Sequence, residues 1–230
     1  MAREAIPGQN DFLNAHKNMR IIPVEINQTV LQGHYEIKAQ LPVTARIEET
    51  FRLKIIIPPR FPKAIPQVYE LDGKIPKESK YHVFENGQLC MGAPLRLKTI
   101  LSEEPNLLTF SEKILTPYLY SFCHKIKYGR YPYGELAHNA PGLVEDYKAL
   151  FKVHDKEGVL RALEALSKSP RVANKLPCPC GCSQRLGKCN YRFFLSRFRN
   201  VEKRRETKET LQKTAQEKQT ELHSKKHDYF

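Results

Sequence analysis

Closely spaced extended runs between residues 21 and 71 constrain the fold of this chain more than any other sequence feature. Ile22, Val24 and Ile26 alternate with other residues, which is the pattern of a half-buried strand. Consecutive strands with short connections usually lie side by side, so the sequence predicts a four-stranded antiparallel meander. The other three predicted strands are 34–41, 51–57 and 67–71.

Helical patterns accompany these strands and predict an α+β fold. A short, weakly amphipathic helix candidate lies within residues 1–20, and apolar residues recur at helical spacing over 114–126. Two further helices are predicted at 143–152 and 157–167. Residues 71–108 lack regular periodicity, which indicates a long loop, and loops of this length are usually either functional or wrongly assigned.

The helix over 114–126 has two possible starts. Thr109 and Glu112 fit a capping box, in which case Pro117 would kink the helix. Alternatively, Thr116 and Pro117 fit an N-cap and a first helical position. The sequence does not decide between them.

The six cysteines divide into two isolated residues, Cys90 and Cys123, and one cluster. A secreted disulfide framework would distribute its cysteines over the whole domain, so clustered thiols indicate a metal site in a reducing compartment. Zinc accepts four thiolates in a tetrahedron, and with no open position such a site is structural. Unligated surface thiols or disulfides are the alternative. The cluster comprises Cys178, Cys180, Cys182 and Cys189.

Two short motifs stand before and at Cys90. Residues 61–68 read Phe-Pro-Lys-Ala-Ile-Pro-Gln-Val, and residues 86–90 read Asn-Gly-Gln-Leu-Cys. They are similar to the Tyr-Pro-Phe-x-x-Pro-x-Val signature and the Asn-Gly-x-Ile-Cys active-site segment of the ubiquitin-conjugating enzyme family. The resemblance covers roughly residues 8–153 and implies that family's fold, a four-stranded meander flanked by helices.

The same resemblance implies that Cys90 accepts a ubiquitin-like protein as a thioester from an activating enzyme and passes it to an amine of a target protein. Eukaryotic members carry an asparagine eight residues before the cysteine, where this chain has His82. That replacement resembles a bacterial branch, some of whose operons serve anti-phage defence. Residues 133–138 and 142–143 are similar to the same branch.

The expected chemistry gives Cys90 and His82 separate roles. A thioester needs an accessible thiol that ionises, and attack by an amine passes through an oxyanion. His82 would chiefly donate a hydrogen bond to that oxyanion and secondly take a proton from the amine. The opposing interpretations are an inert buried Cys90 and an ordinary surface His82. His138 could approach the site without an assigned role, and Cys123 is predicted to be a core residue.

The cysteine cluster resembles the SEC-C zinc motif of many bacterial C-termini. It begins Cys-Pro-Cys-Gly at 178–181, and Cys189 follows Cys180 by nine positions. The motif normally ends in Cys-Cys or Cys-His, but here Asn190 follows Cys189. Cys182 is the natural replacement for the missing ligand, and a nearby histidine is the alternative. The resemblance implies a structural Zn²⁺ in a small helical extension that contacts protein or nucleic acid.

Composition divides the chain into four predicted segments. The tail mixes both charge signs with Glu/Lys pairs at helical spacing, so we expect a partial helix with a frayed end or disorder. The segments are a conjugating domain at 1–153, a helical linker at 154–172, a zinc-binding motif at 173–199 and the charged tail at 200–230.

The net charge of +13 indicates an acidic partner. Basic residues are spread along the chain, so an acidic protein surface is at least as good an expectation as nucleic acid bound through the basic C-terminus. No stretch approaches the roughly 18 apolar residues of a membrane span, and the start of the chain lacks a secretion signal, so we expect a cytoplasmic protein. The alternative to the enzyme is a non-catalytic module of the same fold that binds a ubiquitin-like protein or nucleic acid.

Overall fold

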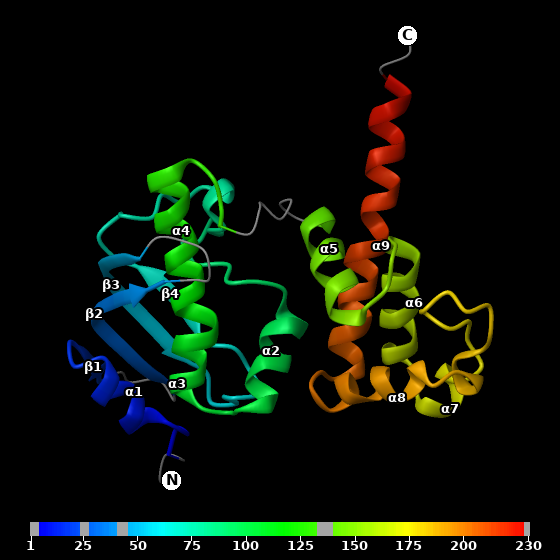
Figure 1. Cartoon of the computed structure of the whole chain (residues 1–230), viewed down its shortest axis with the longest axis horizontal. Coiled ribbons are helices and arrows are strands. Elements are labelled where there is room, and N and C mark those ends of the chain that lie inside the picture. The colour runs from blue at the N-terminus through cyan, green and yellow to red at the C-terminus, as the bar shows by residue number, and fades with distance from the viewer. Residues whose placement is uncertain (1–4, 24–27, 41–45, 133–139, 228–230) are drawn as a thin grey trace. The chain divides into compact units, whose positions relative to one another are not determined.

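A computed structural model of the chain describes residues 5–23, 28–40, 46–132 and 140–227, with side chains described in these ranges except at 140–141 and beyond residue 215. The chain forms two compact units, Met1–Glu135 and Leu136–Phe230 (Figure 1). The predicted segment boundary at residue 153 falls inside the second unit. Helix α5 (Ala140–Phe151), which ends just before that boundary, contacts two other helices of the second unit.

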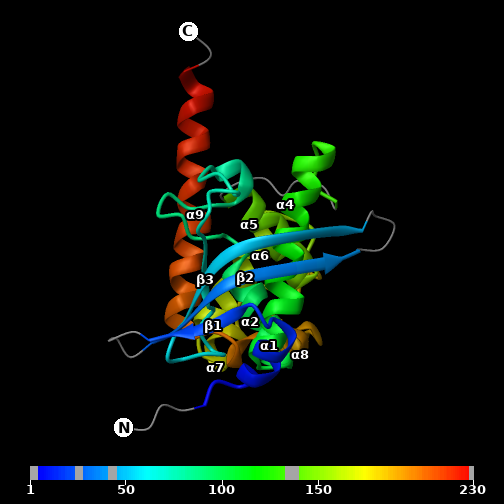
Figure 2. The ribbon, with the colours of Figure 1, turned by 90° about the vertical axis from the view of Figure 1, so that its left-hand side faces the viewer.

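The first unit contains one antiparallel sheet of four strands in chain order. Thr29 pairs with Ile57, and Ile55 pairs with Val68, so each strand hydrogen-bonds to its sequence neighbour. The predicted four-stranded antiparallel meander is confirmed, and Figure 2 shows its first three strands side by side. The first strand lies earlier than the predicted alternation of Ile22, Val24 and Ile26, and Val24 and Ile26 are outside the described residues. The strands are β1 (Met19–Ile22), β2 (Thr29–Ala39), β3 (Ile47–Ile57) and β4 (Gln67–Glu70).

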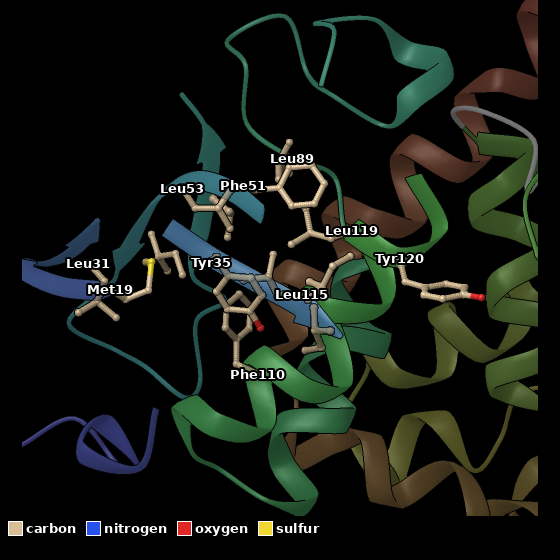
Figure 3. Packing of buried hydrophobic residues seen from close by; sticks show 14 of the residues in the cluster. Met19, Leu31, Tyr35, Phe51, Leu53, Leu89, Phe110, Leu115, Leu119 and Tyr120 are labelled. Atoms are coloured by element: carbon tan, nitrogen blue, oxygen red, sulfur yellow. The ribbon is translucent and has the colours of Figure 1, made fainter. Parts of the chain in front are cut away.

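The core of the first unit lies on one face of this sheet. In β3 the buried side chains are every second residue from Phe51 to Ile57, as the pleat of a strand requires. They point toward the helical segment that carries Leu115 and Leu119 (Figure 3). Each fully buried side chain of this size stabilises the fold by about 1.5–3 kcal/mol. The predicted N-terminal helix is present as α1 (Gln9–Ala15) and buries Phe12.

The covering helical segment begins earlier than either predicted start. Asn106 is the N-cap, and its side chain accepts a 2.8 Å hydrogen bond from the Thr109 backbone N–H. Thr109 and Thr116 are therefore not N-caps, because the residues before them are already helical. Pro117 lacks an N–H, and it directly follows a π-helical turn that rearranges the hydrogen-bond ladder. The segment comprises α3 (Leu107–Phe110), the π turn Ser111–Leu115 and α4 (Thr116–Tyr128).

A helix stands inside the segment that was predicted to be a loop. This is α2 (Pro94–Glu103), in which Leu95 is buried and Leu97 and Leu101 pack in the core. Pro94 lies in its first turn, a position that prolines favour because the missing N–H has no helical partner there. The long loop is thus confined to residues 71–93 and includes a 3₁₀ turn at Ser79–Tyr81.

The second unit is helical. The predicted helices are present as α5 (Ala140–Phe151) and α6 (Lys156–Ser167), and both contact the long α9 (Arg204–His227). The charged tail is thus a helix packed on its own unit over its first turns, where Thr207 and Thr214 are buried. Two short helices, α7 (Pro170–Ala173) and α8 (Tyr191–Ser196), flank the cysteine cluster. Among the described helices, none combines the length and the apolar character needed to cross a membrane.

Candidate functional site

Residues 82–90 form a tight antiparallel loop that ends at Cys90. Val83 and Leu89 form a β-bridge, and Phe84 N–H donates to Gln88 O at 2.9 Å. Next to this bridge, Cys90 N–H donates to His82 O at 2.7 Å. The fold therefore places the two predicted catalytic residues side by side along the backbone, although they are eight positions apart.

Turn chemistry explains the Asn-Gly pair in this loop. The Asn86 side chain accepts a 3.0 Å hydrogen bond from Gln88 N–H, and Gly87 has a φ of 82°, where a side chain would be strained. Leu89 is fully buried in the core (Figure 3), and its N–H donates to Val68 O of β4 at 2.8 Å. The turn sets the length of the loop, and Leu89 ties the loop to the sheet.

The Cys90 thiol is half-buried at the end of this loop. Burial raises its pKa above the usual 9.0, and a hydrogen bond from Gly92 N–H opposes that rise only in part. The thiol is therefore mostly protonated at neutral pH. A reaction at this sulfur requires either a partner that lowers the pKa or capture of the small thiolate fraction.

We expect the alkylation of Cys90 to depend steeply on pH. Because only the thiolate attacks iodoacetamide, the rate should rise roughly tenfold per pH unit and show no plateau below pH 9. Peptide mass spectrometry would follow Cys90 in the intact protein. Cys123 is the internal comparison, because burial raises its pKa to about 11. A plateau below pH 8 at Cys90 would contradict the raised pKa.

His82 lies directly after the 3₁₀ turn with φ 55° and ψ 50°, a left-handed conformation that is uncommon for residues other than glycine. Its ring meets the Tyr131 ring edge to face, with the centroids 5.7 Å apart. Tyr131 also donates its hydroxyl to Lys80 O at 2.7 Å. The Tyr118 hydroxyl of α4 donates to Tyr81 O at 2.9 Å. Two tyrosines thus hold the short segment that presents His82.

Sequence reasoning missed both tyrosines. Tyr118 was visible only as part of a helical apolar pattern, and Tyr131 follows the end of α4 without any motif. The prediction for Cys123 is confirmed, since its side chain packs against the hydrophobic core. His138 and residues 133–138 lie outside the described part of the chain.

The four clustered cysteines converge on one point in the second unit. Their sulfurs all lie within 4.8 Å of one another, so they could hold a metal ion. Cys178 Sγ lies 3.2 Å from Cys180 Sγ, which lies 3.8 Å from Cys189 Sγ. A tetrahedron with metal–sulfur bonds of about 2.3 Å places its sulfurs about 3.8 Å apart, so the donor set fits. Cys182 is the fourth ligand candidate, as predicted from the sequence.

Two chain segments bring these sulfurs together. A turn carries the first three cysteines, and it is closed by Cys178 N–H donating to Gln184 O at 2.8 Å. Cys189 comes from the segment just before α8, where Tyr191 N–H donates to its sulfur at 3.4 Å. Burial raises the pKa of Cys178 and Cys180. Backbone N–H groups point at these sulfurs and at the exposed Cys182 sulfur, and the one from Gln184 lowers the pKa of Cys182 to about 7. Such contacts stabilise the thiolate forms that bind metal.

Helix α6 supports the cysteine turn through Gly158. A Cβ at this position would lie 3.0 Å from Pro179 O and 2.8 Å from Val153 Cβ. Only glycine allows the turn backbone to approach the helix this closely. The candidate metal centre is therefore packed on the second unit rather than suspended in a loose loop.

Comparisons with protein-family models, with curated proteins and with solved structures found no match to this chain.

Proposed function

We propose that this protein has the ubiquitin-conjugating fold and carries a ubiquitin-like protein as a thioester on Cys90. The observation that carries the proposal is the 2.7 Å hydrogen bond from Cys90 N–H to His82 O at the end of a loop tied to β4. It joins the two residues that the motifs around Cys90 assign to the chemistry. The meander and the helices around it are of the kind that the proposal requires.

The proposed reaction has two steps. The Cys90 thiolate attacks the carbonyl carbon of the modifier's C-terminus, a new C–S bond forms, and the cysteine thiolate of the activating enzyme leaves. An amine of the target then attacks the same carbon, an amide forms, and the Cys90 thiolate leaves. His82 donates a hydrogen bond to the oxyanion, and either His82 or solvent takes the proton of the amine.

The proposal is tested by a charging assay, which detects the thioester between Cys90 and the ubiquitin-like protein. The protein is mixed with an activating enzyme, its ubiquitin-like protein and ATP, and run on a non-reducing gel. We expect an adduct of the two proteins that a thiol reductant removes. If the activating enzyme charges itself and this protein forms no adduct, the proposal fails.

Substitutions of His82 separate its two proposed roles. Asparagine and glycine both tolerate the left-handed backbone at this position, but only the asparagine amide can donate to an oxyanion. We expect His82→Gly to slow transfer to a free amine about 10²–10³-fold, the usual cost of losing one such donor. His82→Asn should retain transfer within about tenfold, while charging of Cys90 stays normal in both variants.

The measurement is single-turnover discharge of the purified thioester onto lysine, followed over a range of pH. Equal losses in the asparagine and glycine variants would show that His82 acts as a base rather than as a donor. Unchanged discharge in the glycine variant would remove His82 from the mechanism.

We propose Zn²⁺ as the metal of the four-cysteine site. An all-thiolate set in a tetrahedral arrangement is typical of structural zinc, and it leaves no position for a substrate. The role of the ion would be to hold the cysteine turn and α8 together.

The second candidate function is a binding module of the same fold. The half-burial and raised pKa of Cys90 favour it, because they describe a thiol that is not activated in the free protein. Such a module would bind the ubiquitin-like protein without forming an adduct. The two functions are distinguished when binding and charging are measured on the same sample.

A further inference from the structure

The charge of this protein is locally concentrated around the cysteine cluster. From Ala165 to Val201, here called the basic module, the chain contains no Asp or Glu. A segment of this length without an acidic residue produces a strongly positive local surface, even though basic residues occur along the whole chain. Its eight basic residues are Lys168, Arg171, Lys175, Arg185, Lys188, Arg192, Arg197 and Arg199.

Two of these eight side chains hydrogen-bond to the backbone, and Arg192 does so by donating to Gly187 O at 2.8 Å. Arg199 donates to Ala165 O and Lys168 O, both at 2.8 Å, and thereby caps the end of α6. The seven side chains other than Arg199 are exposed. None of the seven forms an ion pair with any residue that the structure describes. Their charges are therefore available to an external anion.

A hollow beside the cysteine turn gathers three cations. It has a volume of about 210 Å³, and its lining includes Arg161, Lys175 and Arg185. Arg161 also pairs with Glu157 at 3.2 Å, whereas Lys175 and Arg185 have no such partner among the described residues. Gly181 and Ser183 contribute to the wall of the hollow. Two to three cations around a small hollow suit a phosphate group.

The same module exposes an aromatic ring. Phe193 of α8 is 63% exposed, and the Arg192 guanidinium lies 4.5 Å from the centre of its ring. Arg197 similarly lies 4.2 Å from the Phe194 ring. An exposed ring among cations offers a stacking surface to an unpaired base, whereas a duplex keeps its bases stacked inside.

We propose that the basic module binds single-stranded nucleic acid, with a backbone phosphate in the hollow and a base stacked on Phe193. This activity does not depend on the Cys90 thioester. It assigns a ligand class to a surface that the carrier function leaves unused. A purely acidic protein partner would use the cations but would have no need of the ring.

The test is fluorescence anisotropy with a fluorescein-labelled dT12 oligonucleotide and the whole protein in 50–200 mM NaCl. The double variant Lys175→Gln/Arg185→Gln should bind about tenfold more weakly. The slope of log affinity against log salt should fall by about 0.7 in magnitude, since the two substitutions together remove the contact to one phosphate. Phe193→Ala should also weaken binding about tenfold, while Phe193→Tyr retains it.

The matched control is Arg60→Gln/Lys63→Gln, which removes the same charge from exposed positions of the first unit. The proposal is overturned by no binding at 50 mM NaCl, or by equal weakening in this control. It is also overturned if a polyglutamate peptide competes as well as unlabelled dT12, or if Phe193→Ala leaves dT12 binding unchanged. Each of these outcomes leaves the Cys90 assay unaffected, because Cys90 is intact in all variants.

Discussion

Replacement of Cys90 by alanine should abolish the adduct with the ubiquitin-like protein, and replacement by serine should convert it into one that resists thiol reductants. Alanine has no atom that can attack the carbonyl, whereas a serine hydroxyl gives an oxygen ester, which thiols exchange far more slowly. We expect the loss in the alanine variant to exceed about 10³-fold, so that no band remains on a non-reducing gel. The measurement is the fraction of protein charged after a fixed time with activating enzyme and ATP.

The matched control is Cys123→Ala. Cys123 belongs to the same unit and is likewise half-buried, but it packs against the core without any of the loop contacts of Cys90. Its variant should charge at the wild-type rate, and a urea unfolding curve for each variant would check that the fold is retained. If the adduct survived in Cys90→Ala and disappeared in Cys123→Ala, the carrier would be Cys123, and the proposed role of Cys90 would be wrong.

Loss of the metal should disrupt the second unit, and Cys178→Ala should have the same effect as a chelator. Metal binding contributes on the order of 10 kcal/mol in small zinc modules, more than the residues around the cysteine turn could supply by packing. Cys178 is the buried member of the cluster, whereas Cys182 is exposed. We therefore expect Cys178→Ala to lose the ion completely, and Cys182→Ala to bind it more weakly.

Metal content per chain, measured by plasma mass spectrometry, and the urea unfolding transition are the two readouts. Wild type should contain one zinc ion per chain and lose its cooperative transition at lower urea once a strong chelator is added. Cys123→Ala should keep its full metal content. A Cys178→Ala protein with one equivalent of zinc and an unchanged transition would refute the four-cysteine site.

Three of the four strands could be predicted close to their observed positions because the sheet packs on the core chiefly through one face. That burial imposes a period of two on the sequence, which is plain from Phe51 to Ile57. Helix α2 was not predicted from the sequence because two of its buried residues, Leu95 and Leu97, are two positions apart, which is the spacing of a strand rather than of a helix. The tail was expected to be a frayed partial helix or disordered, but the first turns of α9 pack on the unit, and the buried Thr214 donates its hydroxyl to Thr210 O at 2.8 Å within the helix.

The π turn before Pro117 could not be predicted because a distant strand, β2, hydrogen-bonds to it. The Tyr35 hydroxyl of β2 hydrogen-bonds to Thr116 Oγ1 at 2.8 Å and donates to Ser111 O at 3.3 Å. These contacts satisfy polar groups at the two ends of the π turn. Local propensity contains no information about them.

The candidate sites differ in how much the sequence reveals. The metal ligands are recognisable because four thiols within twelve residues are close in space under almost any fold. The left-handed backbone of His82 and the tyrosines that hold its segment depend on tertiary packing. The role of Gly158 also depends on tertiary packing, since no residue near it in the sequence indicates that Pro179 O approaches it.

The loop between His82 and Cys90 also fixes a distance along the chain. Because a β-bridge and one turn join the two residues, a single residue inserted between Val83 and Leu89 would have to be accommodated by this turn, or the hydrogen bond from Cys90 N–H to His82 O would be lost. The sheet below would be unchanged. Among proteins that share this site, the interval between histidine and cysteine should therefore vary less than the identities of the residues within it, and it offers a criterion for recognising distant relatives.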